Sequence, residues 1–208
     1  MTFPRRINRC HGRQLRLVIG ASGVVLSGLA VHDDATGPVE TAVFRAVNRL
    51  PDGWYRPGWV VMQAGNVNAA PLAGLVALGA GRPRLAARLT VTGLTTWTLA
   101  KVIKRWYRRP RPAHLLNDVR CRGKEPAGLG YVSGHAGIAT GIAVALLPEL
   151  RPPARTAIAF AAPLVGLCRI YTGAHLPLDV VGGAALGLAV DAAVSVLIPK
   201  DRTVDHPG

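Results

Sequence analysis

The sequence predicts an all-α integral membrane protein, a bundle of six transmembrane helices with one short interfacial helix. Three observations carry this prediction. Half of the 208 residues are apolar, they gather in long blocks rich in Ala, Gly, Val and Leu, and charged residues fall mainly in the gaps between these blocks. Blocks of about 20 apolar residues match the thickness of a bilayer, whereas a helix on the surface of a soluble domain would show one apolar face.

Six apolar blocks are long enough to cross the hydrocarbon core. The predicted spans are residues 16–32, 58–80, 85–105, 133–150, 155–172 and 177–198. A basic tail of about residues 1–15 precedes the first span. Since no clear small-residue cleavage site follows, we interpret that span as retained rather than as a cleaved signal peptide. Repeats and low-complexity tracts are absent, so residues 1–208 are expected to form a single domain.

The segment between the first two spans has the pattern of an amphipathic helix in the membrane interface. Its apolar residues recur at helical spacing: Val39, Val43, Phe44, Val47 and Leu50. Polar residues stand between them: Glu40, Arg45, Asn48 and Arg49. An aromatic group follows, of the kind that concentrates at the boundary between lipid and water: Trp54, Tyr55 and Trp59.

The charge of the chain follows the gaps between the spans. A formal net charge of +14 often indicates nucleic-acid binding. Here the basic residues lie between apolar blocks, as membrane topology requires, and no nucleic-acid partner is expected. If the dense basic cluster between residues 104 and 124 serves a ligand, the remaining loops favour a cytoplasmic N-terminus. Because the high Ala, Gly, Val and Arg content is typical of a high-GC bacterium, we expect a multi-pass protein of a bacterial inner (plasma) membrane.

The cysteine pattern disfavours a metal site or a disulfide framework. Cys10, Cys121 and Cys168 lie in different segments, and no CxxC pair occurs. We expect neither a metal nor a cofactor.

Three polar islands interrupt the apolar pattern. They are KRWYRRPRP at 104–112, VSGH at 132–135 and CRIYTGAHLPLD at 168–179. Each lies at a junction with a predicted span, and the alternation of spans places all three on one membrane face. For a cytoplasmic N-terminus this is the extracytoplasmic face. Residues far apart in the sequence can therefore meet in one pocket.

The islands contain the residue types that bind phosphate. Lys104, Arg111 and Arg169 supply cations, and an Arg side chain matches phosphate oxygens as a fork. Ser133 and Gly134 begin a predicted helix, whose free backbone N–H groups and dipole attract an anion. Glycine lets that backbone approach a ligand closely. These five residues are the predicted phosphate-binding set.

Two histidines and a carboxylate accompany this set. His175 and Asp179 are four residues apart, and Pro177 suits the first turn of a helix, which would project both to one side. A histidine held at one ring nitrogen by a carboxylate is a better nucleophile, and a second histidine, His135, can protonate a leaving oxygen. Cations and N–H donors stabilise the charge on a transferring phosphoryl group. The pattern indicates metal-free phosphoryl transfer through a phosphohistidine.

The ordered set K-x6-RP, SGH and R-x5-H-x3-D resembles the three-part signature of the type 2 phosphatidic acid phosphatase (PAP2) superfamily. Its residues are Lys104, Arg111, Pro112, Ser133, Gly134, His135, Arg169, His175 and Asp179. The resemblance implies that His175 is the nucleophile, that Asp179 orients it and that His135 is the general acid. It also implies that the lysine and both arginines bind the phosphate.

Two positions depart from the usual pattern. Val132 stands where proline usually precedes SGH, and we expect this to alter the rigidity of the loop more than its chemistry. Cys168 stands where serine usually precedes the last arginine, and a thiol is a weaker hydrogen-bond donor than a hydroxyl. Neither change removes a titrating group, so activity is still expected.

Other polar residues have simpler interpretations. We expect half or more of the additional basic residues to face lipid headgroups or solvent: Arg105, Arg108, Arg109, Arg120, Arg122 and Lys124. Gln63, Asn66 and Asn68 favour interhelical hydrogen bonds over a role in the site. Asp191 lies inside the sixth span, where it is explained by a position near the cytoplasmic end, a neighbouring helix or a dimer interface.

The resemblance implies a membrane lipid phosphate as substrate. A polyprenyl diphosphate or a prenyl-phosphoryl sugar phosphate ranks first, and phosphatidic acid or phosphatidylglycerol phosphate second. Two other classes stay open: a membrane protein that binds lipid phosphates without turning them over, and a transferase. The sequence does not decide whether the chain forms a homo-oligomer.

Overall fold

The computed structural model describes residues 4–32, 36–124 and 126–199, with side chains from residue 11 onward. Within these ranges it contains helices and loops but no strand. The elements are α1 (Pro4–Ala30), α2 (Pro38–Asn48), η2 (Asp52–Trp54), α3 (Tyr55–Met62), η3 (Gln63–Gly65), α4 (Ala69–Gly79), α5 (Pro83–Tyr107), α6 (Pro112–Leu115), α7 (Gly134–Leu146), η4 (Leu147–Glu149), α8 (Ala154–Tyr171) and α9 (Pro177–Leu197). The predicted all-α architecture is confirmed.

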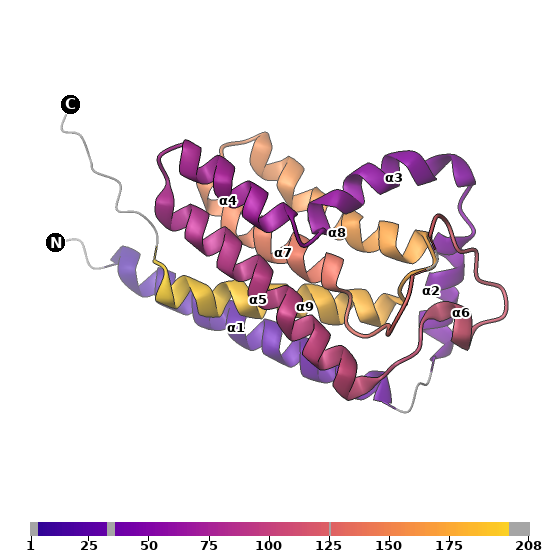
Figure 1. Ribbon diagram of the computed structural model, residues 1–208. Helices are drawn as coiled ribbons and strands as arrows, with labels where there is room; N and C mark the ends of the chain where they lie inside the picture. The colour runs from indigo at the N-terminus through magenta and orange to yellow at the C-terminus, as the bar shows by residue number, and fades with distance from the viewer. Residues whose placement is uncertain (1–3, 33–35, 125, 200–208) are drawn as a thin grey trace.

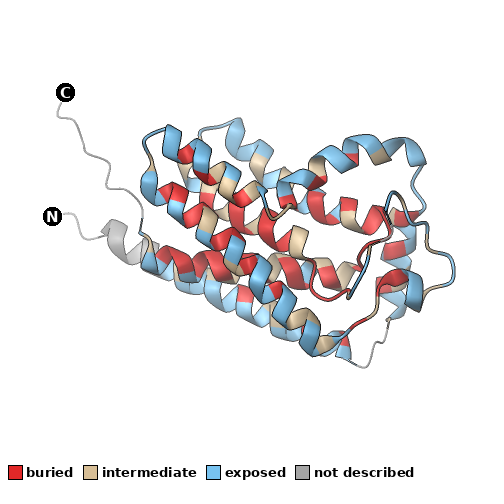
Figure 2. Ribbon diagram, viewed as in Figure 1, coloured by how far each residue is buried: buried red, intermediate tan, exposed pale blue. Residues whose placement is uncertain are grey.

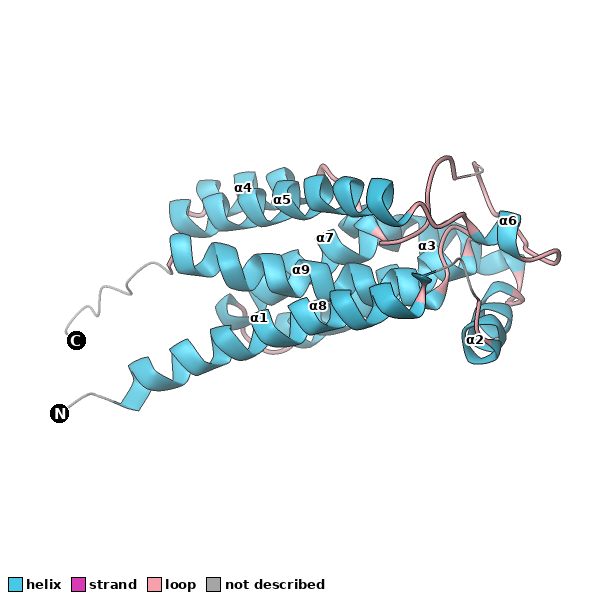
Figure 3. Cartoon of the chain, turned by 90° about the horizontal axis from the view of Figure 1, so that it is seen from below, coloured by secondary structure: helices cyan, strands magenta, loops and turns pink. Residues whose placement is uncertain are grey.

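The long helices lie side by side in an elongated bundle (Figures 1 and 3). Helix α9 packs against α1, α5 and α7, while α8 covers α7, and α4 lies along α5. Buried residues concentrate on α7 and α9, whereas α1, α3 and α4 present largely exposed faces (Figure 2). Helices α2 and α6 lie at one end of the bundle, opposite the start of α1 and the end of α9 (Figure 1).

Glycine allows α7 and α9 to approach each other closely. A side chain at Gly183 would collide with the backbone of Ser133, and one at Gly187 with the backbone of Gly137. Small residues at helix crossings are typical of membrane bundles, because packing of this kind replaces the hydrophobic driving force that operates in water. The contact fixes the start of α7 beside the first turns of α9.

The predicted second span, residues 58–80, is broken in the structure. Helices α3 and α4 meet at an angle of 67°, and the polar amides stand at the break. They bond locally rather than between helices: Gln63 Nε2 donates to Trp59 O, and Asn68 N donates to Asn66 Oδ1. The expectation of interhelical hydrogen bonds was therefore wrong. Local bonding of this kind competes with the helix ladder and favours a bend.

The helix predicted between the first two spans is present as α2, but its buried face differs from the apolar pattern. Phe44 is buried together with Glu40 and Asn48, while Val39 and Val43 are exposed. The sequence pattern predicted an amphipathic helix in the membrane interface, with its apolar side chains toward lipid. Exposed apolar side chains can face lipid, and buried polar groups are tolerated where they find partners in the protein.

The helix that contains the first predicted span begins before that span. Helix α1 starts at Pro4 rather than at residue 16, so part of the predicted basic tail is helical. The other long helices lie within a few residues of the predicted spans.

By length and composition alone, two helices of the described residues, α8 and α9, qualify as membrane spans, and the bent pair of residues 52–65 and 69–79 qualifies as a third. The count of six is therefore not confirmed. Helix α5 carries charged residues at both ends, and α7 has only 13 residues, about 20 Å of helix, which is shorter than the hydrocarbon core.

A buried ion-pair network lies near the end of the bundle where α1 begins. Asp191 of α9 accepts hydrogen bonds from Arg88 of α5 at 2.9 and 2.7 Å and from Arg16 of α1 at 3.0 Å. Of the three origins considered for Asp191, the structure shows pairing with neighbouring helices. The network joins the three helices through one fully buried carboxylate.

Candidate active site

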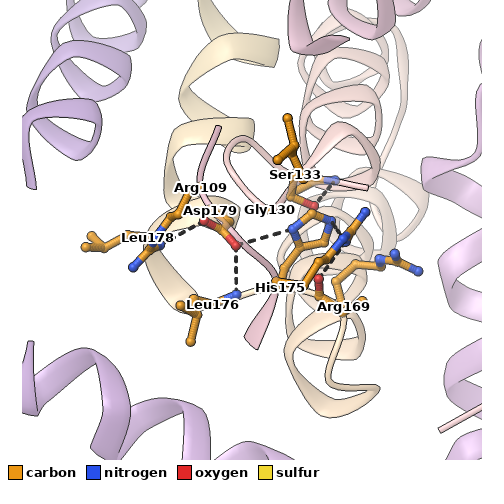
Figure 4. A network of polar contacts seen from close by, with 12 residues as sticks. Arg109, Gly130, Ser133, Arg169, His175, Leu176, Leu178 and Asp179 are labelled. Atoms are coloured by element: carbon orange, nitrogen blue, oxygen red, sulfur yellow. Dashed lines mark hydrogen bonds and ion pairs between the residues drawn. The ribbon is translucent and has the colours of Figure 1, made fainter. Parts of the chain in front are cut away.

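The three polar islands meet near the end of the bundle that carries α2 and α6. The backbone of Ser133, at the start of α7, donates to the carbonyl of Asp179 at 2.8 Å. Gly130 N donates to Arg109 O, also at 2.8 Å, which ties the loop before α7 to the loop after α5. Figure 4 shows residues from all three islands around His175. Residues more than 60 positions apart in the sequence therefore share one site.

His175 and Asp179 form a directed pair at the start of α9. His175 Nδ1 lies 3.4 Å from Asp179 Oδ2, and the same oxygen accepts from Leu176 N at 2.9 Å (Figure 4). Asp179 is fully buried and His175 nearly so. Because α9 begins at Pro177, this carboxylate also caps the first turn of the helix. The cap fixes the carboxylate on the side of the imidazole.

The second nitrogen of His175 faces a cation. Arg111 Nη1 lies 3.1 Å from His175 Nε2, and since a guanidinium can only donate, Nε2 carries the lone pair and Nδ1 the proton. Burial, reinforced by the positive charges of Lys104 and Arg111, lowers the pKa of His175 well below that of a free histidine. The imidazole is therefore neutral at pH 7, the state that a nucleophile requires.

Lys104 and Arg111 are held by loop carbonyls. Lys104 Nζ donates to Leu129 O and Gly130 O, both at 2.7 Å. The Arg111 guanidinium donates to Ala174 O at 2.6 Å and to further carbonyls of the loop before α7. These bonds fix the direction of both side chains without neutralising their charges.

Arg169, in the last turn of α8, is differently placed. Its Nε is buried and has no hydrogen-bond partner among the described residues, and its Nη1 lies 3.7 Å from the sulfur of Met62, a weak acceptor. Buried donors normally have partners, so this guanidinium is suited to an anionic ligand. Its charge acts on both His135 and His175.

His135 and its neighbours form the start of α7. Ser133 is the N-cap, and its hydroxyl accepts a weak bond from Ala136 N at 3.5 Å, which leaves its own proton available to donate. His135 is half-buried and lies within electrostatic reach of His175. Gly134 has room for a side chain, the nearest atom being 4.0 Å away on Ala100, so packing does not require glycine there.

Two further charged residues join the site, and the sequence interpretation missed both. Arg109 is fully buried, and its Nη1 donates to Asp179 Oδ1 at 2.9 Å. The same guanidinium binds Glu40 of α2 at 2.7 and 3.2 Å. Burial opposes the charge of Arg109, but hydrogen bonds and charges of Glu40 and Asp179 outweigh it and raise its pKa.

A sequence signal existed for each of these residues. Arg109 lies between the two cations of the first island, and Glu40 shares the helical face of Phe44 and Asn48 at spacings of four and eight. Of the basic residues expected to face lipid or solvent, four are exposed: Arg105, Arg108, Arg120 and Lys124. Arg122 instead packs on the ring of Tyr171 at 4.1 Å.

The two positions that depart from the family pattern lie inside the protein. Val132 is fully buried in a cluster with Tyr131 and residues of α9. Cys168 is buried, and its sulfur would lie 3.3 Å from a side chain at Gly58, which places the thiol against α3. No group of three or more His, Cys, Asp or Glu side chains suited to a metal ion occurs in the part of the chain that the structure describes.

A scan against protein-family models supplies the deciding comparison. The model of the PAP2 superfamily matches residues 84–203, more than half of the chain. The chain belongs to the PAP2 superfamily. The predicted membership is confirmed, and all eight predicted site residues lie inside the matched region, whereas Glu40 lies outside it.

Curated relatives from mycobacteria are similar in sequence. The decaprenylphosphoryl-5-phosphoribose phosphatase of Mycolicibacterium smegmatis is 33% identical over 133 residues, which are 63% of this chain and 65% of the relative. The protein of the same name from Mycobacterium tuberculosis is 31% identical over 140 residues, 66% of this chain and 70% of the relative. The match with the first of these relatives thus spans just under two thirds of its length.

Two solved structures share the fold. Aquifex aeolicus LpxE superposes with a TM-score of 0.69 at 24% identity, covering 80% of this chain and 99% of that one. The PAP2-type phosphatidylglycerolphosphate phosphatase of Bacillus subtilis gives a TM-score of 0.70 at 24% identity, covering 89% of this chain and 98% of that one. The bundle therefore has the same fold as these two proteins.

Proposed function

We propose that this protein is a metal-independent lipid phosphatase that removes a phosphate from a membrane lipid through a phosphohistidine at His175. The arrangement of His175 carries the proposal. One ring nitrogen is held by Asp179, and the other, with its lone pair, faces Arg111 in a site that also contains Lys104 and Arg169. A site that only bound lipid phosphates would need the cations but not the buried histidine–carboxylate pair.

In the first step, a substrate phosphate lies among the three cations and the N–H groups at the start of α7. Arg111 turns from His175 to a phosphate oxygen, and Arg169 gains the acceptor that it lacks. Nε2 of His175 then forms a bond to phosphorus while the bond to the leaving oxygen breaks. The leaving oxygen takes a proton from His135, acting as general acid. Asp179 stabilises the positive ring.

In the second step, water attacks the phosphohistidine. His135, now neutral, accepts a proton from this water, the bond between phosphorus and Nε2 breaks, and inorganic phosphate is released. Ser133 is proposed as an additional donor to the phosphate, and Gly134 as the point where the backbone approaches it.

For the substrate, a prenyl-phosphoryl sugar phosphate or a polyprenyl diphosphate comes first, and a phosphatidic acid or phosphatidylglycerol phosphate second. The names of the mycobacterial relatives support this order, and the two solved structures share only the fold. We further propose that all six long segments cross a bacterial plasma membrane, with the site on the extracytoplasmic side. A phosphate at headgroup level would then meet the site while the tail stays in the bilayer.

The test is phosphate release by the purified protein in detergent, in the presence of a chelator and without added metal. A panel of polyprenyl-phosphoryl sugar phosphates, prenyl diphosphates and phosphatidic acids ranks the substrates. His175→Ala is expected to lower kcat by at least about 10³-fold while the protein stays folded. Turnover near the wild-type level in this variant would overturn the mechanism, and release that stops with chelator would overturn metal independence.

Lys104→Ala tests whether Lys104 contributes to substrate binding. It is expected to lower kcat/KM less than His175→Ala does, mainly through a higher KM, because two arginines remain to bind the phosphate.

Binding of lipid phosphate without release of inorganic phosphate in the wild type would favour the non-catalytic alternative. Transfer to a lipid or alcohol acceptor in preference to water would favour a transferase.

A further inference from the structure

Behind the candidate nucleophile lies a line of three buried charges: Asp179, Arg109 and Glu40. Arg109 bridges the two carboxylates, donating to Asp179 Oδ1 at 2.9 Å and to Glu40 Oε2 at 2.7 Å (Figure 4 shows the contact with Asp179). Exposed fractions are 0% for Arg109 and Asp179 and 6% for Glu40. Charges so deeply buried persist only when paired, so the three side chains form one unit.

Glu40 also binds the helix that carries Asp179. Its Oε1 accepts from Leu178 N at 3.0 Å, a backbone donor in the first turn of α9 that has no partner within the helix. Asp179 satisfies another donor of the same turn, Leu176 N. Both carboxylates thus hold the N-terminus of α9, and α2 is connected through Glu40 to the loop of His175.

The order of charges explains why a second carboxylate is useful. Arg109 alone would neutralise Asp179 and compete with His175 for its oxygens. Glu40 occupies the other side of the guanidinium, so the three groups together carry one negative charge. When Nε2 of His175 bonds to phosphorus, the ring becomes positive while Nδ1 keeps its proton, and a nearby negative charge stabilises this state.

We propose that Glu40 is a positioning residue for the reaction: through Arg109 it fixes the Asp179 carboxylate against His175 and maintains a net negative charge beside the phosphohistidine. This inference rests on the proposed function. Glu40 lies outside the region matched by the family model, residues 84–203. The inference therefore assigns a part in catalysis to helix α2.

The experiment compares Glu40→Gln with a matched control, Asp118→Asn. Asp118 forms ion pairs with Arg45 of α2 and with Arg49, which directly follows α2, so it also anchors α2, but it does not contact the Asp179 unit. Steady-state kcat and KM are measured with the lipid phosphate that the wild type hydrolyses best, together with melting temperatures. Glu40→Gln is expected to lower kcat by roughly 10- to 100-fold with KM within about threefold. Asp118→Asn is expected to change both by less than about twofold.

Rescue by conservative change separates positioning from folding. Glu40→Asp keeps the charge and is expected to restore kcat to within about tenfold of the wild type. If Glu40→Gln does not fold, Arg109→Lys decides: it keeps the charge but cannot hold both carboxylates, so kcat is expected to fall while KM is retained.

Three results would overturn the inference. They are a Glu40→Gln variant with wild-type kcat, an equal loss in Asp118→Asn, or, where Arg109→Lys is the test, wild-type kcat in that variant. The proposed function fails separately, if the wild type releases no phosphate or if His175→Ala remains active.

Discussion

Two buried ion networks lie toward opposite ends of the bundle, and they use the same residue types differently. Toward the end with α2, one arginine lies between two carboxylates, Glu40 and Asp179. Toward the other end, one carboxylate, Asp191, lies between two arginines, Arg16 and Arg88. The first network carries a net charge of −1 and the second a net charge of +1, by addition of the formal charges.

The two networks differ in whether a carboxylate oxygen is left to bind a group outside the arginines. The oxygens of Asp191 are all engaged by arginines that hold three helices together. Asp179 keeps Oδ2 for His175 and for a backbone N–H. The same ion-pair chemistry therefore holds helices together in one place and supports the proposed nucleophile in the other, and variants of the two networks should affect different properties.

The largest expected effect distinguishes the two aspartates by activity. Asp179→Asn is expected to lower kcat by about 10³- to 10⁴-fold, because the amide can present its NH2 group to His175 and favour the wrong tautomer. Asp191→Asn is expected to leave kcat within about threefold, since it is remote from the cations of the site. Phosphate-release kinetics of the two variants check this. Similar losses in both would remove the distinction between the networks.

Asp191→Asn, which has little expected effect on kcat, is expected to lower the stability of the protein. Asp191→Asn leaves the buried Arg88 without a compensating charge, and removing one partner of a buried pair costs about 3–5 kcal/mol. The free energy of unfolding in mixed detergent micelles should fall by this order. Replacing both Asp191 and Arg88 by apolar residues should recover much of the loss, and failure to recover would show that the carboxylate has another role.

His175 is expected to make the stability of the protein depend on pH. His175 has a pKa well below that of a free histidine because it is buried, so the unfolded chain binds a proton that the folded chain does not. Stability is therefore lost as the pH falls below the unfolded value of about 6.5. Relative to His175→Gln, the wild type should lose about 1 kcal/mol between pH 6.5 and 5.5. A difference that stays constant with pH would show that the imidazole binds its proton equally well in the folded and unfolded chains, contrary to the lowered pKa.

The smallest effect is expected at Cys168. Its thiol lies against α3 rather than toward the cations, so Cys168→Ser should change kcat/KM by less than about threefold. A large gain in kcat/KM would show that a hydroxyl at this position reaches the substrate.

Local spacing in the sequence predicted some contacts of the candidate site but not others. His175 and Asp179 meet because Asp179, in the first turn of α9, turns its carboxylate back to cap the helix, beside the residues that precede it. Ser133 precedes α7 because a serine is a good N-cap. Such relations act over a few residues, and apolar blocks mark where helices lie. The sequence did not predict the break between α3 and α4, because the segment that contains Gln63, Asn66 and Asn68 is as apolar as a continuous span.

The sequence by itself determined the helical class, the approximate helices, and the set of cations, histidines and carboxylate that the PAP2 signature places together. Only the tertiary structure decided which charges are partners. Glu40 and Arg109, like Asp191 and Arg88, are widely separated in the chain, and no local pattern states that their helices or loops will face each other. The physical reason is that a buried charge is stabilised by the group opposite it in space, whereas the sequence records only periodicity along the chain.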